Sequence, residues 1–95
     1  MNDEPVLPGA EPFFHEGNEI GVLVVHGFTG STQSMRPLGA ALAQAGYTVS
    51  GPRLAGHGIS PAAMATTGAR DWVASAEQAF ADLRTHCKQM FVTGL

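Results

Sequence analysis

The sequence predicts an α/β fold: a mostly parallel sheet with helices on both faces. Short apolar runs typical of strands alternate along the chain with segments of helical period. The run at residues 20–25, IGVLVV, is continuously apolar or small, as in a strand that is covered on both faces. With 44% hydrophobic and 14% charged residues, the composition is that of a globular protein of about one small domain.

The first elements expected are an irregular lead-in and a β-hairpin. Residues 1–12 carry three prolines and three acidic residues and have no regular period. The segments PFFHE and EIGVLVV then flank Gly17-Asn18, a pair suited to the positive φ angles of a tight turn. This pattern predicts a hairpin whose second strand, at 20–25, is the more buried.

A helix is expected after the loop HGFTGS. Thr32 or Ser34 can cap it, and Pro37 suits its first turn. Gly46 follows the last residue of the apolar period and is typical of the position just past a helix end. Residues 47–50 then predict a second core strand.

The remaining half of the chain predicts a loop, a helix and a strand. Residues 51–68 are rich in glycine and proline without a sustained period, which favours a long loop. A helix is expected from about Arg70 to Thr85. Trp72 and Phe80 lie on its apolar stripe, where core packing is the simplest use. Residues 90–93 are the third strand of the expected parallel set.

The loop from His26 to Gly30 is the first candidate for chemistry. It lies where a buried strand turns towards a helix, a place where α/β sheets bind ligands. Gly27 and Gly30 let the backbone turn sharply and leave its N–H groups approachable, so that they could hold developing negative charge. A tight connection without a ligand explains the same composition equally well, and local sequence leaves both interpretations open.

Several classes of function are disfavoured. The spacing G-x-x-G differs from the G-x-G-x-x-G of dinucleotide sites, and the loop lacks the lysine of a P-loop. The net charge is −3 and the five Lys and Arg residues are scattered, so we expect no nucleic-acid partner. The four histidines share no metal-ligand spacing, and the single cysteine, Cys87, is interpreted as an inert thiol. We therefore expect neither a metal nor a cofactor.

The N-terminal sequence opens with acids and prolines and lacks the pattern of a signal peptide. The longest strongly apolar run, at 20–25, is far shorter than the roughly 20 residues that span a bilayer. These features predict a soluble, cytoplasmic protein without stable membrane insertion. They leave the oligomeric state open.

Four stretches carry a resemblance to a known family: VLVVHGFTGSTQSMRPLGAALAQAGYTV, PRLAGHG, DWVASAEQAF and MFVTGL. In this order and spacing they resemble the start of an α/β-hydrolase, and more narrowly of the bacterial monoacylglycerol lipases and related small carboxylesterases. The resemblance spans roughly residues 5–95. It implies that residues 1–95 are the N-terminal part of a single α/β-hydrolase domain, whose remainder is not in this chain.

The resemblance also implies where the catalytic residues lie. In α/β-hydrolases the nucleophilic serine sits in a G-x-S-x-G elbow, followed later by the acid and the histidine. Gly94-Leu95 matches the first two positions of that elbow, so we expect the chain to stop one residue before the nucleophile. All three triad residues would then follow Leu95.

Within the chain, the resemblance places one oxyanion-hole donor at the backbone N–H of Phe28. The Phe28 ring, with Gly27 and Thr29, would contact the substrate; plain core packing is the alternative for the ring. Because the family's catalytic base follows the serine, His26 is interpreted as a brace that hydrogen-bonds to backbone groups of the loop.

Arg53 and His57 lie in the PRLAGHG loop. We interpret them as further supports of the HGFTG loop or of the pocket rim. The alternative is a local turn in which Arg53 makes an ion pair.

The function implied is a serine hydrolase of carboxylic esters that acts on a small amphiphilic ester, most like a monoacylglycerol lipase. A carboxylesterase of short acyl chains is the near alternative. The alternative from a different class is a non-catalytic, hydrolase-like binding module that has lost its triad. A serine immediately after Leu95 would favour the enzyme.

Overall fold

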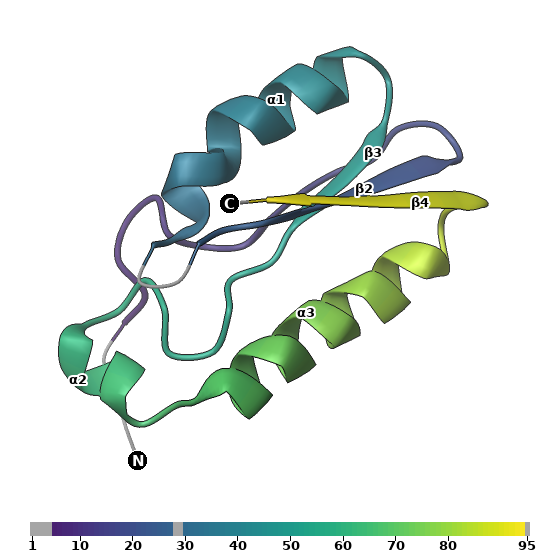
Figure 1. The fold of residues 1–95 in the computed structure, drawn as a ribbon. Helices are drawn as coiled ribbons and strands as arrows, with labels where there is room; N and C mark the ends of the chain where they lie inside the picture. Colours follow the sequence, from purple (N-terminus) through teal and green to yellow (C-terminus); the bar gives the residue numbers. More distant parts are fainter. Residues whose placement is uncertain (1–4, 28–29, 95) are drawn as a thin grey trace.

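The computed structural model describes residues 5–27 and 30–94, and there a β-sheet lies between two helical layers (Figure 1). Helix α1 covers one face of the sheet and α3 the other. The α/β fold class with helices on both faces is therefore confirmed. In chain order the elements are β1 (Phe13–His15), β2 (Ile20–Val25), the 3₁₀ helix η1 (Thr32–Met35), α1 (Arg36–Gln44), β3 (Thr48–Gly51), α2 (Pro61–Ala65), α3 (Ala69–Arg84) and β4 (Gln89–Gly94).

The strand order in the described sheet is β1-β3-β2-β4. Strands β3 and β4 both run parallel to β2, so that Val22 is aligned with Val49 on one side and with Phe91 on the other. Strand β1 is antiparallel to β3. The sheet is thus mostly parallel, with β2 in its interior and His26 directly after that strand.

The prediction of an N-terminal β-hairpin is wrong. Strand β1 pairs with β3 instead of β2, with Phe13 opposite Gly51. The turn residues bond to the start of β3: Gly17 N–H donates to Thr48 Oγ1 at 2.9 Å and Asn18 N–H to the Gly46 carbonyl at 2.8 Å. These long-range bonds carry β1 past β2 to the far side of β3.

The helix after the HGFTGS loop begins differently from the expectation. Ser31, rather than Thr32 or Ser34, is the cap, and its Oγ accepts from Gln33 N–H at 3.3 Å. One turn of 3₁₀ helix then leads into α1, which has a proline in its first turn as expected. Gly46 follows the helix end with φ of 102°, a left-handed conformation that favours glycine.

The expected long loop at 51–68 contains a short helix. Ser60 Oγ accepts from Ala63 N–H at 3.1 Å and Pro61 occupies the first turn, the combination that starts α2. Five residues are too few to display a helical period, so α2 left no periodic signal in the sequence.

The core has two sides because the side chains of β2 alternate. Val22 and Val24 are buried with Met35 and Val49 on the α1 side of the sheet. On the other side Leu83 of α3 is buried, and a Cβ added to Gly21 would lie 3.1 Å from its side chain. A glycine in β2 therefore lets α3 approach the sheet closely.

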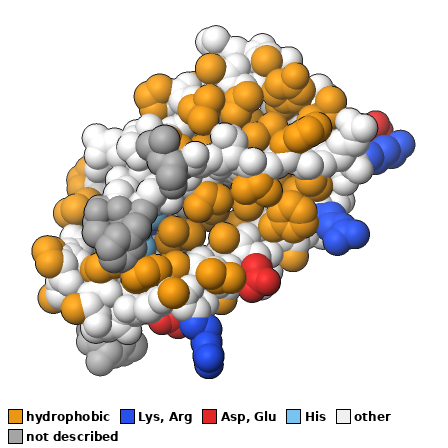
Figure 2. Space-filling view, in the orientation of Figure 1, with side chains coloured by type: hydrophobic (Ala, Val, Ile, Leu, Met, Phe, Trp, Pro, Cys, Tyr) orange, Lys and Arg blue, Asp and Glu red, His pale blue; other side chains and the backbone are white. Residues whose placement is uncertain are grey.

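Strand β4 lies at one end of the described sheet and is poorly covered. Phe91 is 58% and Val92 60% exposed, and adjacent residues of a strand point to opposite faces. Figure 2 has the same orientation as Figure 1 and shows hydrophobic side chains gathered on the face of the molecule where β4 lies in front. None of the helices in the described part of the chain has the length and apolar character needed to cross a membrane.

Candidate active site

His26 follows the central strand directly and is 2% exposed. Its Nε2 accepts a hydrogen bond from Leu54 N–H at 3.1 Å, and its Nδ1 lies 3.0 Å from the Gly27 carbonyl. A backbone N–H can only donate, so Nε2 must be the unprotonated nitrogen and Nδ1 the donor to Gly27. The ring is therefore a neutral imidazole that joins two loops.

The surroundings of His26 favour this neutral form. Burial lowers the pKa of His26, the hydrogen bond to Gly27 opposes this effect, and electrostatic interaction with His57 and Arg53 lowers it further. The net direction is downward from the usual value of 6.5. At neutral pH the ring thus keeps the acceptor that Leu54 needs.

His57 is buried against His26. It is 1% exposed, and the two ring centroids are 4.9 Å apart. His57 Nδ1 lies 3.0 Å from the Ala55 carbonyl, and the ring is nearly perpendicular to that of Trp72, with 5.5 Å between the ring centroids. Arg53 Nη1 donates to the His57 carbonyl at 2.9 Å, which closes the loop on itself.

The PRLAGHG loop is also tied to the helices that follow it. Ala55 N–H donates to Ser75 Oγ of α3 at 3.0 Å. Trp72 Nε1–H donates to Thr67 Oγ1 at 2.9 Å, and that hydroxyl lies 2.8 Å from the Met64 carbonyl of α2. The structure thus brings the predicted residues His26, Arg53 and His57 into one contiguous cluster.

Beyond His26, Gly30 N–H donates to the Gly27 carbonyl at 2.9 Å. Phe28 and Thr29, the predicted oxyanion donor and substrate contact, lie outside the described residues. Gly27 and Gly30, on either side of them, hold the ends of the loop between His26 and the Ser31 cap.

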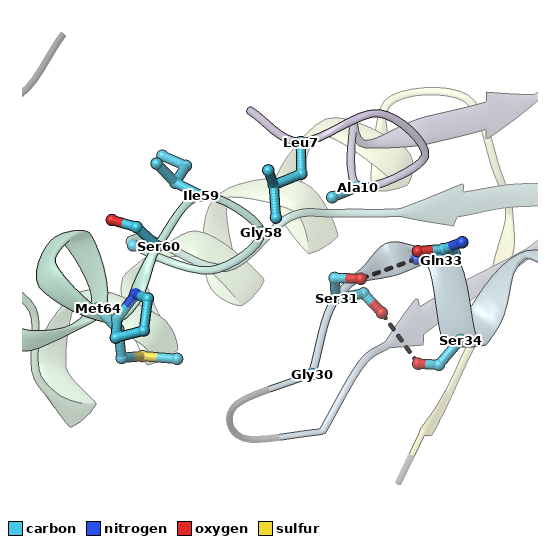
Figure 3. Close-up of a pocket in the computed structure, with 12 residues that line it drawn as sticks. Leu7, Ala10, Gly30, Ser31, Gln33, Ser34, Gly58, Ile59, Ser60 and Met64 are labelled. Atoms are coloured by element: carbon cyan, nitrogen blue, oxygen red, sulfur yellow. Dashed lines mark hydrogen bonds between the residues drawn. The ribbon is translucent and has the colours of Figure 1, made fainter. Parts of the chain in front are cut away.

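A cavity of about 690 Å³ adjoins this loop at Gly30 (Figure 3). It lies between the N-terminal segment, the start of η1 and the segment that leads into α2. Most of its side chains are apolar: Leu7, Ala10, Ile59, Pro61 and Met64. The other lining residues are three serines, a glutamine and three glycines: Ser31, Ser34, Ser60, Gln33, Gly30, Gly56 and Gly58.

The sequence interpretation missed this cavity. Leu7 and Ala10 come from the lead-in, where nothing in the local pattern marks a wall of a site. Ser60-Pro61 was a usable signal, because a serine followed by proline is typical of a helix start. Within residues 5–27 and 30–94, no three His, Cys, Asp or Glu side chains are grouped so that they could hold a metal ion.

The mostly parallel sheet, covered on both faces, and the loop at the end of its central strand define the N-terminal part of an α/β-hydrolase. A family model described as serine aminopeptidase, S33, matches residues 18–93. The chain belongs to this hydrolase family.

Relatives of known name share this segment. The chain is 56% identical over 91 residues to a thermostable monoacylglycerol lipase of Bacillus sp. (strain H-257), which covers 96% of this chain and 36% of the lipase. It is 44% identical over 62 residues to a carboxylesterase of Bacillus subtilis (strain 168), covering 65% of this chain and 25% of the esterase.

A solved structure from work on LipS and LipT, two metagenome-derived lipolytic enzymes, matches with a TM-score of 0.93 and 56% identity. The match covers 96% of this chain and 37% of that structure. The chain therefore spans about a third of the length of this lipase and of this solved structure.

Proposed function

We propose that this chain is the N-terminal part of a serine hydrolase of carboxylic esters, most specifically a monoacylglycerol lipase. The observation that carries the proposal is 56% identity, across nearly the whole chain, to a thermostable monoacylglycerol lipase. A short-chain carboxylesterase is the second candidate, favoured by the 44% identity to a carboxylesterase. In both cases the nucleophile, the acid and the base belong to a segment after Leu95. We call the protein that contains residues 1–95 and that segment the intact hydrolase.

In this proposal the serine attacks the ester carbonyl, a histidine takes its proton, and water releases the acyl-enzyme. The Phe28 N–H, between Gly27 and Gly30, supplies one donor to the tetrahedral oxyanion, and Phe28 and Thr29 contact the substrate. A preorganised donor of this kind stabilises the transition state by about 2.7–4 kcal/mol.

His26, Arg53 and His57 act as positioning residues for that donor. Support comes from the hydrogen bond of Leu54 N–H to His26 Nε2 and from the bond of Arg53 to the His57 carbonyl. Because both nitrogens of His26 already face backbone groups, the ring holds the end of β2 against the PRLAGHG loop and takes no proton in catalysis.

The test is hydrolysis by the intact hydrolase. We expect turnover of 1-monoacylglycerols and of p-nitrophenyl esters, and covalent inactivation by a sulfonyl fluoride that labels active serines. Preference for acetate over long-chain esters and monoacylglycerols would favour the carboxylesterase. Absence of both hydrolysis and labelling would refute the enzyme and favour a non-catalytic module of the same fold.

A further inference from the structure

Trp72 is a half-buried residue in the first turn of α3, and it contacts the histidines at the end of β2. Its ring is nearly perpendicular to that of His57, with 5.5 Å between the ring centroids. The His57 ring in turn lies 4.9 Å from that of His26, and these two histidines are 1% and 2% exposed. A row of three rings therefore connects α3 with the residue that follows the central strand.

The orientation of the Trp72 ring is fixed by its indole N–H. Nε1–H donates to Thr67 Oγ1 at 2.9 Å, and the Thr67 hydroxyl donates in turn to the Met64 carbonyl at 2.8 Å. The same hydroxyl lies against the PRLAGHG loop, because a Cβ added to Gly56 would be only 2.6 Å from Oγ1. With its polar end bonded and its ring against His57, the indole cannot rotate without losing one of these contacts.

At the other end of this row, His26 holds the backbone where the HGFTG loop begins. Its Nδ1–H donates to the Gly27 carbonyl at 3.0 Å, and its Nε2 accepts from Leu54 N–H at 3.1 Å. A shift of the His26 ring would lengthen or break both hydrogen bonds. The position of Gly27 therefore depends on the ring that packs against His26, which is that of His57.

We propose that Trp72, held by Thr67, is a positioning residue for the oxyanion donor. It keeps His57 in contact with His26, and His26 in turn fixes the Gly27 carbonyl. The inference rests on the proposed function, in which the donor follows Gly27 directly. Acylation and deacylation both pass through a tetrahedral oxyanion, so a misplaced donor slows whichever step limits turnover. Because the donor acts chiefly in the transition state, kcat should fall while KM changes little.

The experiment measures kcat and KM of three variants of the intact hydrolase with p-nitrophenyl butyrate. Trp72→Phe removes the indole N–H, and Thr67→Val removes its acceptor at nearly constant volume. We expect kcat to fall about tenfold in both, a partial loss compared with the roughly 10²–10³-fold effect of removing an oxyanion donor. KM should stay within about twofold. Thr67→Ser keeps the hydroxyl and should recover most of the kcat that Thr67→Val loses.

Phe80→Leu is the matched control. Phe80 is also a half-buried aromatic residue of α3, but it lies eight positions beyond Trp72, about 12 Å along the helix axis. Its replacement should lower stability in urea unfolding, as Trp72→Phe does, and leave kcat unchanged. An unchanged kcat in Trp72→Phe and Thr67→Val, or an equal fall in Phe80→Leu, overturns the inference and leaves the proposed ester hydrolysis standing.

Hydrogen exchange of the Leu54 N–H gives a readout that needs no catalysis, because this N–H is bonded to His26 Nε2. We expect it to exchange several-fold faster in Trp72→Phe and Thr67→Val than in the parent, Thr67→Ser and Phe80→Leu. Faster exchange in this pattern supports the hold of Trp72 on His26 even if the parent hydrolyses no ester, in which case the proposed function alone fails. Equal exchange in all five proteins overturns the inference.

Discussion

At the scale of single residues, His26 connects the central strand to a loop that lies 28 positions further along the chain. Its ring offers one acceptor to Leu54 N–H and one donor to the Gly27 carbonyl. A buried N–H that loses its acceptor destabilises a protein by about 1–3 kcal/mol. The main energetic consequence of His26 should therefore be on stability and on the placement of the loop.

We expect His26→Ala in the intact hydrolase to lower the free energy of unfolding by about 1–3 kcal/mol, because Leu54 N–H is left unpaired. His26→Gln should recover part of this loss, since its amide oxygen can reach the position of Nε2. Urea unfolding measures both effects. His15→Ala, at an exposed histidine, is the control and should change stability by less than about 0.5 kcal/mol. Equal stability of His26→Ala and His15→Ala would contradict the brace.

The same residue makes stability depend on pH. The pKa of His26 in the folded protein lies below its value of about 6.5 in an unfolded chain, chiefly through burial. Its contribution is therefore fully present above pH 6.5 and is lost as the pH falls towards and through the folded pKa. Protonation at Nε2 would place two donors, the ring and Leu54 N–H, against each other.

We therefore expect the stability difference between the parent and His26→Gln to shrink as the pH is lowered from 7.5 to 5. The slope per pH unit should not exceed about 1.4 kcal/mol, the limit for one proton. Urea titrations at matched pH values measure the difference. A difference that stays constant across this range would show that His26 does not titrate differently in the folded and unfolded states.

At the scale of elements, Phe13 locks β1 to α1. A Cβ added to Gly39 of α1 would lie only 2.5 Å from the nearest carbon of this ring. The ring also fills the space that a Cβ on Gly51 of β3 would need. The Arg36 guanidinium lies 5.2 Å from the ring centroid on the same side. Two glycines on different elements thus form a slot for one aromatic ring.

Gly39→Ala should therefore destabilise the intact hydrolase by about 1–3 kcal/mol, although alanine is favoured over glycine within a helix by about 1 kcal/mol. In a Phe13→Ala background the slot is empty, and the same change should become neutral or stabilising. A double-mutant cycle by thermal or urea unfolding measures the coupling. Additive effects of the two changes would contradict the slot.

The elements that the sequence predicted well are those whose signals are local. Strand β2 is a continuous apolar run, and α3 carries its stripe over 16 residues. The strand that pairs with β1 could not be predicted from the local sequence. Gly17 and Asn18 suit a hairpin turn, but in the structure they bond to Thr48 and Gly46. Helix α2 was missed because five residues show no period.

At the scale of the whole molecule, the candidate site also divides into residues that local motifs predicted and residues that only the fold brings together. The pattern of HGFTG and PRLAGHG pointed to His26, Arg53 and His57, which the fold brings together. The cavity could not be predicted in this way, because Leu7 and Met64 are far apart in the sequence and come to line one cavity only in the folded chain. The motifs thus marked two loops that the fold brings together, whereas the cavity walls come from residues with no motif.

Strand β4 leads to a prediction about the isolated segment. Phe91 and Val92 are exposed on opposite faces of a strand whose second edge has no partner among the described residues. Parallel strands are normally covered on both faces, and an open apolar edge promotes association. Residues 1–95 expressed alone should therefore self-associate as concentration rises, as measured by sedimentation velocity, and should hydrolyse no ester.

The double change Phe91→Lys and Val92→Lys places a charge on each face of β4 and should shift the isolated segment towards monomer. Leu38→Lys places one charge on α1, away from the sheet edge, and should leave the association unchanged. A segment that stays monomeric without any substitution would refute β4 as the associating edge. Ester turnover by the isolated segment would instead refute the proposal that the nucleophile lies after Leu95, so the two measurements test separate claims about the same molecule.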